Sequence, residues 1–210
     1  DRDLNMIENM YPSKCMQTFY KFYIQPYFIN KINKPIFLEI GCGSGANFKI
    51  FSNDLIELYG LDLSEKAIQR VSQISQKIKT VIGISYELPY EDSFFDFVIA
   101  DASLYYCETL DQFKKSIDEI YRVLKKDGFM RIYTKANDDA IVQKRNYIEK
   151  NIYKASSKWE THMQLICLSK DDLISYLNKF KEISIGREKF NYINSDLDKQ
   201  HSFWLATAKK

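Results

Sequence analysis

The segment EIGCGSG, residues 39–45, holds three of the chain's seven glycines within five residues. Glycine loses more conformational freedom on folding than any other residue, so this concentration indicates a special task. A tight turn through Gly41, Gly43 and Gly45, before a helix starting near Ala46, would let a ligand touch the backbone. The amide groups at that helix start would attract an anionic group. We therefore expect the backbone of this segment to bind a ligand.

Two acidic residues accompany the glycines. Glu39 lies just before the turn, and Asp62 ends the next apolar run, 23 residues later. A carboxylate at the end of that second strand can accept hydrogen bonds from both hydroxyls of a ribose. The spacing is G-x-G-x-G, whereas dinucleotide folds that bind a pyrophosphate carry G-x-G-x-x-G. An acid at Glu39 also suits a cationic ligand better than a pyrophosphate, which disfavours a nicotinamide cofactor.

At these residues the chain resembles the class I, Rossmann-like methyltransferases that use S-adenosylmethionine, a cofactor with positive sulfonium and amino groups. FLEIGCGSG at 37–45 resembles the family's first motif, and LYGLDLS at 58–64 resembles its second. ELPYEDSFFDFVIA at 87–100 and IYRVLKKDGFMRIYT at 120–134 resemble the segments that follow. The resemblance covers about 34–135 and continues more weakly through KFKEISIG and SFWLATAK, which are similar to the hairpin that closes the family's seven-stranded sheet.

The resemblance implies S-adenosyl-L-methionine as cofactor and S-adenosyl-L-homocysteine as product. Gly41, Cys42 and Gly43 would line the methionine moiety, with Glu39 near its amino end and Asp62 on the ribose. The full set of cofactor-binding residues that it implies is Glu39, Gly41, Cys42, Gly43, Gly45, Asp62, Leu63, Ser85, Tyr86 and Asp101.

The adenine contact is where the sequence departs from the family. The family often has Asp after the glycine of its third segment, whereas here Gly83 is followed by Ile84. Recognition of the adenine amino group would then use backbone groups or Ser85, while Leu63 and Tyr86 flank the ring. Cys42 is expected to pack rather than react, because no cation or base accompanies its thiol.

The reaction implied is an in-line displacement at the sulfonium methyl, for which alignment is the main task of the protein. A base is needed only if the acceptor is protonated, as a hydroxyl or an ammonium group is. The candidate catalytic residues are Asp101, Tyr105, Tyr106 and His162. Pocket packing is the alternative for the two tyrosines, and a surface or structural role is the alternative for His162.

Short apolar runs alternate with amphipathic helices and predict the frame that positions these residues. The strands are expected at Phe37–Ile40, Glu57–Asp62, Phe95–Ala100, and from Lys79 and Gly128 onward. One helix would be capped by Ser64, with Ala67, Val71, Ile74 and Ile78 on one face. A second would be capped by Asp111 and end at Gly128. A third would start at Ser169 and Asp172, a capping box, and bury Leu173, Ile174 and Leu177.

The fold class is α/β, a doubly wound, mostly parallel seven-stranded sheet with an antiparallel last strand, helices on both faces and an N-terminal helical cap.

We expect one methyltransferase domain over 1–210. It divides into an N-terminal helical cap at 1–33, a cofactor-binding half at 34–135, an insertion at 136–164 that walls the acceptor pocket, and a closing helix and hairpin at 165–210. Phe19, Tyr23 and Tyr27 recur every four residues and form an aromatic stripe. Either this stripe caps the pocket or the helix simply packs on the sheet.

Composition excludes several other classes. The 30 Lys+Arg residues nearly balance the 28 Asp+Glu, the net charge is +2, and no apolar run approaches a membrane span. We expect a cytoplasmic protein that is a monomer or weak homodimer, with no nucleic-acid or membrane partner. Four cysteines without a C-x-x-C pair and two histidines predict no metal site. The chain begins at Asp1 without an initiator Met, so a short leader could have been lost.

The acceptor is predicted to be a small polar metabolite, methylated on oxygen. Four cations, Arg131, Lys135, Lys144 and Arg145, fall where a pocket wall is expected and would suit a phosphate or a carboxylate. A surface-polysaccharide precursor is one acceptor of that kind. The alternatives are N-methylation of a small amine, methylation of tRNA or protein, and a non-enzymatic cofactor sensor.

Overall fold

The structure is a computed structural model that describes residues 11–28, 34–51, 55–142, 146–155, 163–191 and 200–210. Its helices are α2 (Lys14–Phe19), the π-helix η1 (Tyr20–Ile24), α3 (Gln25–Phe28), the 3₁₀-helices η2 (Ala46–Ile50) and η3 (Leu104–Tyr106), α4 (Glu65–Ile74), α5 (Leu110–Val123) and α6 (Lys170–Tyr176). Its strands are β1 (Ile36–Ile40), β2 (Glu57–Asp62), β3 (Lys79–Ile82), β4 (Phe95–Asp101), β5 (Leu124–Lys135), β6 (Tyr147–Glu149), β7 (Ile152–Lys154), β8 (Gln164–Ile166), β9 (Lys181–Asn191) and β10 (Gln200–Lys209).

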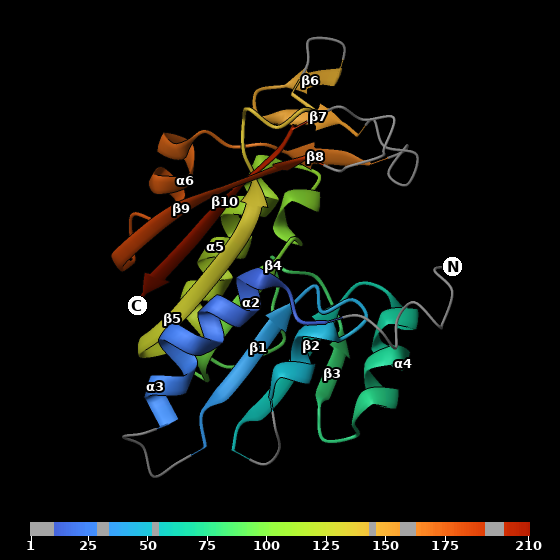
Figure 1. The fold of residues 1–210 in the computed structure, drawn as a ribbon, viewed down its shortest axis with the longest axis vertical. Coiled ribbons are helices and arrows are strands. Elements are labelled where there is room, and N and C mark those ends of the chain that lie inside the picture. Colours follow the sequence, from blue (N-terminus) through green and yellow to red (C-terminus); the bar gives the residue numbers. More distant parts are fainter. Residues whose placement is uncertain (1–10, 29–33, 52–54, 143–145, 156–162, 192–199) are drawn as a thin grey trace.

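Seven strands form one sheet in the order β3-β2-β1-β4-β5-β10-β9 (Figure 1). The first five are parallel, and β10 runs antiparallel to both β5 and β9. This confirms the expected fold class and the closing hairpin. The chain order reverses between β1 and β4, and at such a switch point the carboxyl ends of the strands leave a crevice for a ligand.

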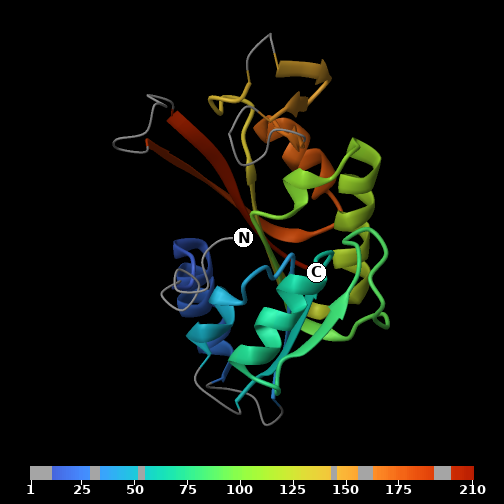
Figure 2. The same ribbon diagram turned by 90° about the vertical axis from the view of Figure 1, so that its right-hand side faces the viewer.

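Helices cover both faces of this sheet (Figure 2). On one face, α2 and α4 bury Met16, Phe19 and Val71 against the sheet residues Phe37 and Phe97. On the other face, α5, η3 and α6 pack over the side chains of β1, β4 and β5. Because β4 is enclosed on both sides, six of its seven residues are buried, which explains its uninterrupted apolar sequence.

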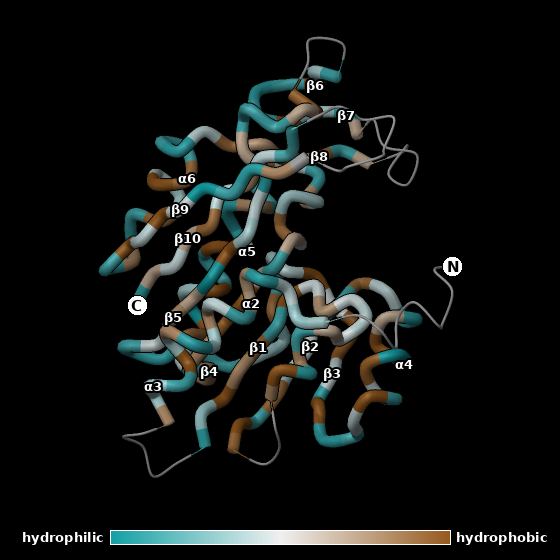
Figure 3. Tube along the Cα trace, viewed as in Figure 1, coloured by the Kyte–Doolittle hydropathy of each residue, from teal (hydrophilic) through white to brown (hydrophobic). Residues whose placement is uncertain are grey.

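Two of the helix caps agree with expectation. The Ser64 hydroxyl accepts a hydrogen bond from the Ala67 amide, and Ser169 and Asp172 form a complete capping box. Along α4, hydrophobic and hydrophilic residues alternate as coloured bands (Figure 3). One face of the helix therefore reaches the core.

Several helix boundaries were predicted wrongly. The cap of α5 is Thr109 rather than Asp111, and the helix ends at Val123 because the chain continues directly into β5. Ile78 follows the end of α4, although it is buried, and Ile174 is 40% exposed. After Gly45 there is only a short 3₁₀-helix, so no long helix dipole faces the glycine turn.

The aromatic N-terminal stripe packs on the sheet, which was one of the two alternatives. Phe19 is fully buried, and the ring of Tyr27 meets that of Phe97 edge to face. Asp96 anchors this end of the helices, since its carboxylate accepts hydrogen bonds from the Tyr27 hydroxyl and from the Ile36 amide. The opposite end of α2 points to the carboxyl ends of β1 and β4, where Ser13 caps it.

The segment 136–164 contains structure that its sequence did not predict. Together with the next residues it forms a second, antiparallel sheet in the order β6-β7-β8. The strands β6 and β7 have three residues each, and this is too few for an alternation of polar and apolar residues to be recognised in the sequence. Within the part of the chain that the structure describes, no helix is long and apolar enough to cross a membrane.

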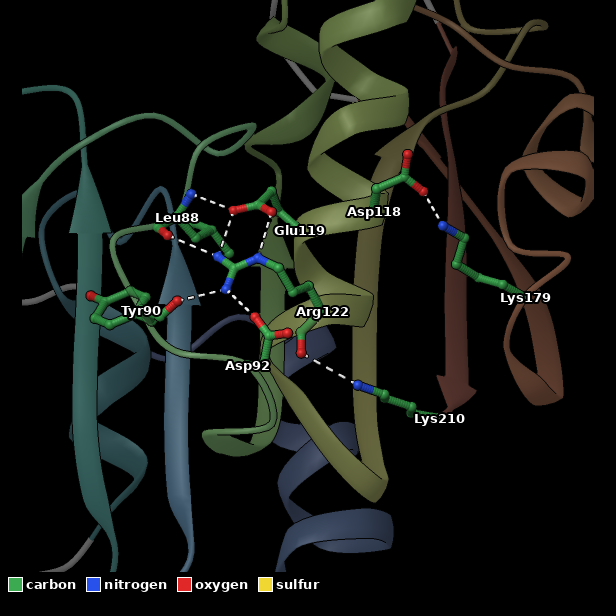
Figure 4. A network of polar contacts seen from close by, with 8 residues as sticks. All are labelled: Leu88, Tyr90, Asp92, Asp118, Glu119, Arg122, Lys179 and Lys210. Atoms are coloured by element: carbon green, nitrogen blue, oxygen red, sulfur yellow. Dashed lines mark hydrogen bonds and ion pairs between the residues drawn. The ribbon is translucent and has the colours of Figure 1, made fainter.

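Arg122 on α5 fastens the connection between β3 and β4 (Figure 4). Its guanidinium donates in bidentate fashion to Glu119, at 2.7 and 2.8 Å. It also donates to the carbonyl oxygens of Leu88 and Tyr90, at 2.9 and 2.7 Å. Glu119 in turn accepts the Leu88 amide at 2.7 Å. The planar guanidinium of Arg122 therefore satisfies the Glu119 carboxylate and two carbonyl groups of the loop between β3 and β4.

We expect Arg122→Ala to lower the free energy of unfolding by roughly 2 kcal/mol, because Glu119 and two carbonyl groups lose a charged donor. Chemical denaturation monitored by circular dichroism measures this change. Lys115→Ala on the same helix is the control, because Lys115 makes only an exposed i,i+4 pair with Asp111. If both variants unfold alike, the Arg122 network contributes no more than a surface pair does.

Candidate cofactor site

A cleft with two compartments lies at the carboxyl ends of β1, β2 and β4. The larger is a cavity of about 760 Å³, lined by the glycine turn and by polar side chains from β1, η2, β2, α4, β4 and β5. The smaller, about 300 Å³, is lined mainly by apolar side chains. Both compartments include Gly41, Asp62 and Ala102. One elongated ligand with a polar end and a flat apolar end would fill both.

The glycine turn opens the larger compartment. Gly41, Gly43 and Gly45 have φ angles of 72°, 53° and 76°, a left-handed conformation that other residues adopt only at a cost. A Cβ on Gly41 would lie 2.4 Å from the Cβ of Ser103, whereas a Cβ on Gly43 would meet nothing within 4 Å. Gly43 therefore borders open space among the described residues, a cradle where a ligand can approach the backbone.

Asp62 joins the two compartments. Its Oδ2 accepts the Gly43 amide at 2.8 Å, and its Oδ1 accepts the Ser64 amide at 2.9 Å. These bonds hold the carboxylate in one orientation while each oxygen keeps another lone pair. The geometry suits two neighbouring hydroxyl groups, and it shows that Asp62 also shapes the glycine turn.

Glu39 is buried in the wall of the larger compartment. Its Oε1 accepts the Asn47 side-chain amide at 2.7 Å, while its Oε2 has no hydrogen-bond partner among the described residues. Burial raises the pKa of Glu39 well above its ordinary value, although the hydrogen bond from Asn47 opposes the shift. A buried acceptor without a partner costs free energy. Beside an open cavity, it suits a cationic donor from a ligand.

Asp101 lies on the other side of Asn47. Its Oδ2 accepts the Asn47 side-chain amide at 3.2 Å and the hydroxyl of Ser13. Burial raises the pKa of Asp101, and the bonds from Ser13 and Asn47 and the charge of Arg131 oppose that shift. The backbone amide of Ser13 also donates to the Asn47 Oδ1 at 2.8 Å. The N-terminal helix is thus tied to both carboxylates.

The smaller compartment contains two of the three residues that were expected near an adenine, Leu63 and Ser85. Leu63 lines it and is 72% exposed, so its side chain can cover a flat ligand. The hydroxyl of Ser85 lies 2.8 Å from that of Ser116, which itself donates to the Gln112 carbonyl. Ser85 therefore donates to Ser116, and the lone pairs of the Ser85 oxygen can accept a hydrogen bond from a ligand amine. Tyr86 is half-buried and lines neither cavity as the described residues define them.

The predicted catalytic residues do not all meet. Asp101 lines the larger compartment and Tyr106 the smaller, and both include Ala102 beside Asp101. Tyr105 is buried against Phe203, with the Lys135 ammonium 5.7 Å from its ring centre, as expected of a packing role. His162 lies outside the described residues. Cys42 is buried, and burial raises the pKa of its thiol, which agrees with packing.

The expected cationic wall is not formed by Arg131 and Lys135. Lys135 is buried and pairs with Asp139 at 3.2 Å, while the Arg131 guanidinium lies over the Phe19 ring, 5.7 Å from its centre. Neither residue is part of the described lining of either cavity. Both residues are buried, because a long strand that is covered on both faces buries polar as well as apolar side chains. Lys144 and Arg145 lie outside the described residues.

The sequence analysis missed Ser13, Asn47, Lys66, Arg70 and Tyr133, all of which line the larger compartment. Asn47 stands two residues after the last glycine, and Tyr133 lies at the end of β5 beside Asp101. Such positions at strand and turn ends are a usable signal. Ser13 had none, because it is 88 residues from the carboxylate it contacts.

Comparison with known proteins shows which family this part of the chain resembles. Residues 38–132 match the family model described as a methyltransferase domain. The matched segment therefore resembles a methyltransferase domain. This confirms the resemblance of the four motifs, and members of this family use S-adenosylmethionine as methyl donor.

Similar proteins differ in what their names say they do. The chain is 32% identical to a tRNA (carboxymethyluridine(34)-5-O)-methyltransferase of Arabidopsis thaliana over 97 residues, 46% of this chain and 23% of that protein. It is 29% identical over 161 residues to an uncharacterized protein of Methanocaldococcus jannaschii, 75% of this chain and 70% of that protein. The chain thus spans about a quarter of the Arabidopsis protein and most of the archaeal one.

Solved structures share the fold of this methyltransferase domain. A methyltransferase from Methanosarcina mazei superposes with a TM-score of 0.71 at 19% identity, over 88% of this chain and 97% of that chain. The described residues fit the cofactor of the family on two independent observations. The Glu39 Oε2 lacks a hydrogen-bond donor, and Gly43 faces open space.

A pair of glycine variants separates binding from folding. Both Gly43→Ala and Gly45→Ala place a side chain at positive φ, which costs about 1 kcal/mol of stability. A Cβ on Gly45 would also lie 2.7 Å from Ile74, so Gly45→Ala should unfold more readily. Gly43→Ala should instead weaken S-adenosylhomocysteine binding by about tenfold or more, because its methyl group enters the cradle. Calorimetry and thermal unfolding of both variants test this. Equal loss of affinity at constant stability would contradict it.

Glu39→Gln should have opposite effects on stability and on binding. A buried acid with a raised pKa binds protons more tightly when folded, so stability falls as pH rises from the unfolded pKa through the folded one. Glutamine does not titrate, so the ligand-free variant should be the more stable protein at neutral pH. Affinity for S-adenosylhomocysteine should increase with pH in the wild type, because the ligand ammonium favours the ionised Glu39, and this increase should shrink in Glu39→Gln. Titration calorimetry between about pH 5 and pH 8 measures the affinity of the wild type and of Glu39→Gln. Thermal unfolding of the ligand-free proteins over the same range measures their stability. Identical pH profiles would exclude Glu39 as a partner of the ammonium.

Proposed function

We propose that this protein binds S-adenosylmethionine in the two-compartment cleft and transfers its methyl group to a small polar metabolite. The observation that carries the proposal is the buried Glu39 Oε2 without a partner, beside the open cradle at Gly43. An ammonium group would satisfy that oxygen, and an amino-acid chain would fit over Gly43. We further propose that residues 1–210 act as one methyltransferase domain, with the cofactor-binding half at 34–135.

In this proposal each residue of the cleft has a physical task. Glu39 and Asn47 hold the amino end of the methionine moiety, and Asp62 holds the ribose hydroxyls. Leu63 and Ser85 contact the adenine, one by packing and the other as a hydrogen-bond acceptor. The cofactor, when bound, supplies an activated methyl group. The protein has to hold the acceptor in line with that group and keep water away from it.

Asp101 is proposed as the residue that takes the acceptor proton. Burial raises the pKa of Asp101, which makes its carboxylate a stronger base than an exposed one. Tyr133 lines the same compartment, and its hydroxyl donates to Glu188 at 2.9 Å. The Asp101 carboxylate in the lining supports a hydroxyl or amine acceptor. Arg131 and Lys135, which were expected to bind an anionic acceptor, are not in the described lining of the cleft, whereas Lys66 and Arg70 are.

Oxygen remains the proposed methyl acceptor, and a small amine is the second candidate. The specific observation in favour of an amine is the Asp101 carboxylate in the lining of the larger compartment, since a protonated amine would be drawn toward it. The name of the Arabidopsis relative adds tRNA as a macromolecular alternative. The chain's net charge of +2 offers little attraction to a polyanion.

Transfer of labelled methyl groups tests the proposed function. The panel contains sugar phosphates, nucleotide-linked sugars, small amines, bulk tRNA and a protein extract. We expect turnover with small hydroxyl compounds or amines, and a loss of about 100-fold or more in Asp101→Asn, because the amide cannot accept the proton. S-Adenosylhomocysteine affinity should change far less. Turnover with tRNA or protein alone would reject the small-molecule acceptor, and binding without any turnover would favour a sensor.

A further inference from the structure

Met163 is the described residue of segment 136–164 that lines the cleft. It belongs to the smaller compartment and lies directly before β8, outside the matched residues 38–132. Its side chain is 45% exposed. The sheet of β6, β7 and β8 lies beyond the carboxyl ends of β1 and β2 (Figure 1). A residue of this second sheet therefore reaches the crevice that the first sheet forms.

The compartment beside Met163 is an apolar slot. Ile40, Leu61 and Leu104 are buried in its lining, whereas Leu63, like Met163, exposes much of its side chain. Exposed apolar side chains in the lining of a concave apolar site gain free energy when a flat ligand covers them. A thioether is also polarisable and packs well against an aromatic ring. The slot is thus suited to a planar heteroaromatic group.

The backbone at Met163 is held in place. Its carbonyl oxygen accepts the Ala155 amide at 2.9 Å, next to the paired residues of β7 and β8. β8 itself packs on η3, and its residues Leu165 and Ile166 are fully buried. Met163 therefore stands on a supported strand end.

The base of the second sheet is fixed as well. The Leu168 amide donates to the Lys135 carbonyl at 3.1 Å, and the Leu168 carbonyl accepts the Trp204 indole at 2.8 Å. Asp139 adds a bond to the Ser202 amide at 2.8 Å. Although burial opposes it, the hydrogen bond from His201 and the charge of Lys135 lower the pKa of Asp139 to about 2, so this anchor stays ionised. The wall is in position before a ligand arrives.

We propose that Met163 packs against the adenine of the cofactor, so that the second sheet is part of the cofactor site as well as a wall for the acceptor. The inference rests on the proposed function, because it assumes that the adenine occupies the smaller compartment. It adds a specificity determinant that lies outside the matched domain. Adenine binding is then sensitive to the insertion, and not only to the segments that follow β2, β3 and β4.

The test compares three variants by calorimetry with S-adenosylhomocysteine and with 5′-methylthioadenosine, which has the adenine but no amino-acid group. Met163→Ala should weaken both ligands by a similar factor of about ten, because it removes apolar contact with the ring alone. Met163→Leu should stay within about threefold of the wild type. Ile148→Ala is the matched control, since Ile148 is 44% exposed on the same sheet and is not in the described lining of either cavity. Its affinities should not change.

Each outcome points to a different conclusion. If Met163→Ala and Ile148→Ala bind both ligands like the wild type, Met163 is not an adenine contact. If only S-adenosylhomocysteine is affected, Met163 lies at the amino-acid end and the proposal is equally wrong. If the wild type binds neither ligand, the proposed function fails instead. Should Met163→Ala not fold, Met163→Gln, which keeps the length of the side chain but not its apolar surface, carries the same test.

Discussion

A carboxylate buried at the switch point of the sheet is the constraint on which the rest of the site depends. Glu39 lies between β2 and β4, away from water, and Asn47 satisfies only one of its oxygens. Burying such a group is expensive unless it is paired. The glycine turn leaves space beside it, and a cationic ligand can supply what the protein withholds. The unsatisfied oxygen destabilises the ligand-free protein. In the proposed site a positively charged cofactor would bind selectively, because it supplies the missing donor.

The N-terminal helices belong to this site although their aromatic stripe is not its cap. One end is anchored by Tyr27 to Asp96, and between the two ends the ring of Phe19 meets that of Phe97 edge to face. The other end is Ser13, which bonds to Asn47 and Asp101. Removing this helix would take the Ser13 hydroxyl from Asp101 and the Ser13 amide from Asn47, the residue that donates to Glu39. Packing at one end and polar bonding at the other make the helix a support for the chemistry.

The smaller compartment, where we propose that the adenine binds, is built differently. Ser85 comes from the segment after β3, Leu63 directly follows β2, and Met163 directly precedes β8. Three segments that are distant in sequence thus supply one polar and two apolar side chains to its lining. Apolar contacts tolerate small shifts, whereas the bonds around Glu39 depend on direction. The cleft therefore combines a strict polar end with a more permissive apolar end.

The sequence by itself determined the strands of the seven-stranded sheet, the positive-φ turn, and the placement of Glu39 and Asp62 toward strand ends. These features follow from periods of two and 3.6 residues and from the conformational freedom of glycine, which act over a few residues. Only the tertiary structure decided that Arg131 and Lys135 turn into the packed interior, that Ser13 reaches Asp101, and that Met163 overhangs the cleft. Such contacts join residues far apart along the chain, and their geometry follows from how whole elements pack, which no local pattern encodes.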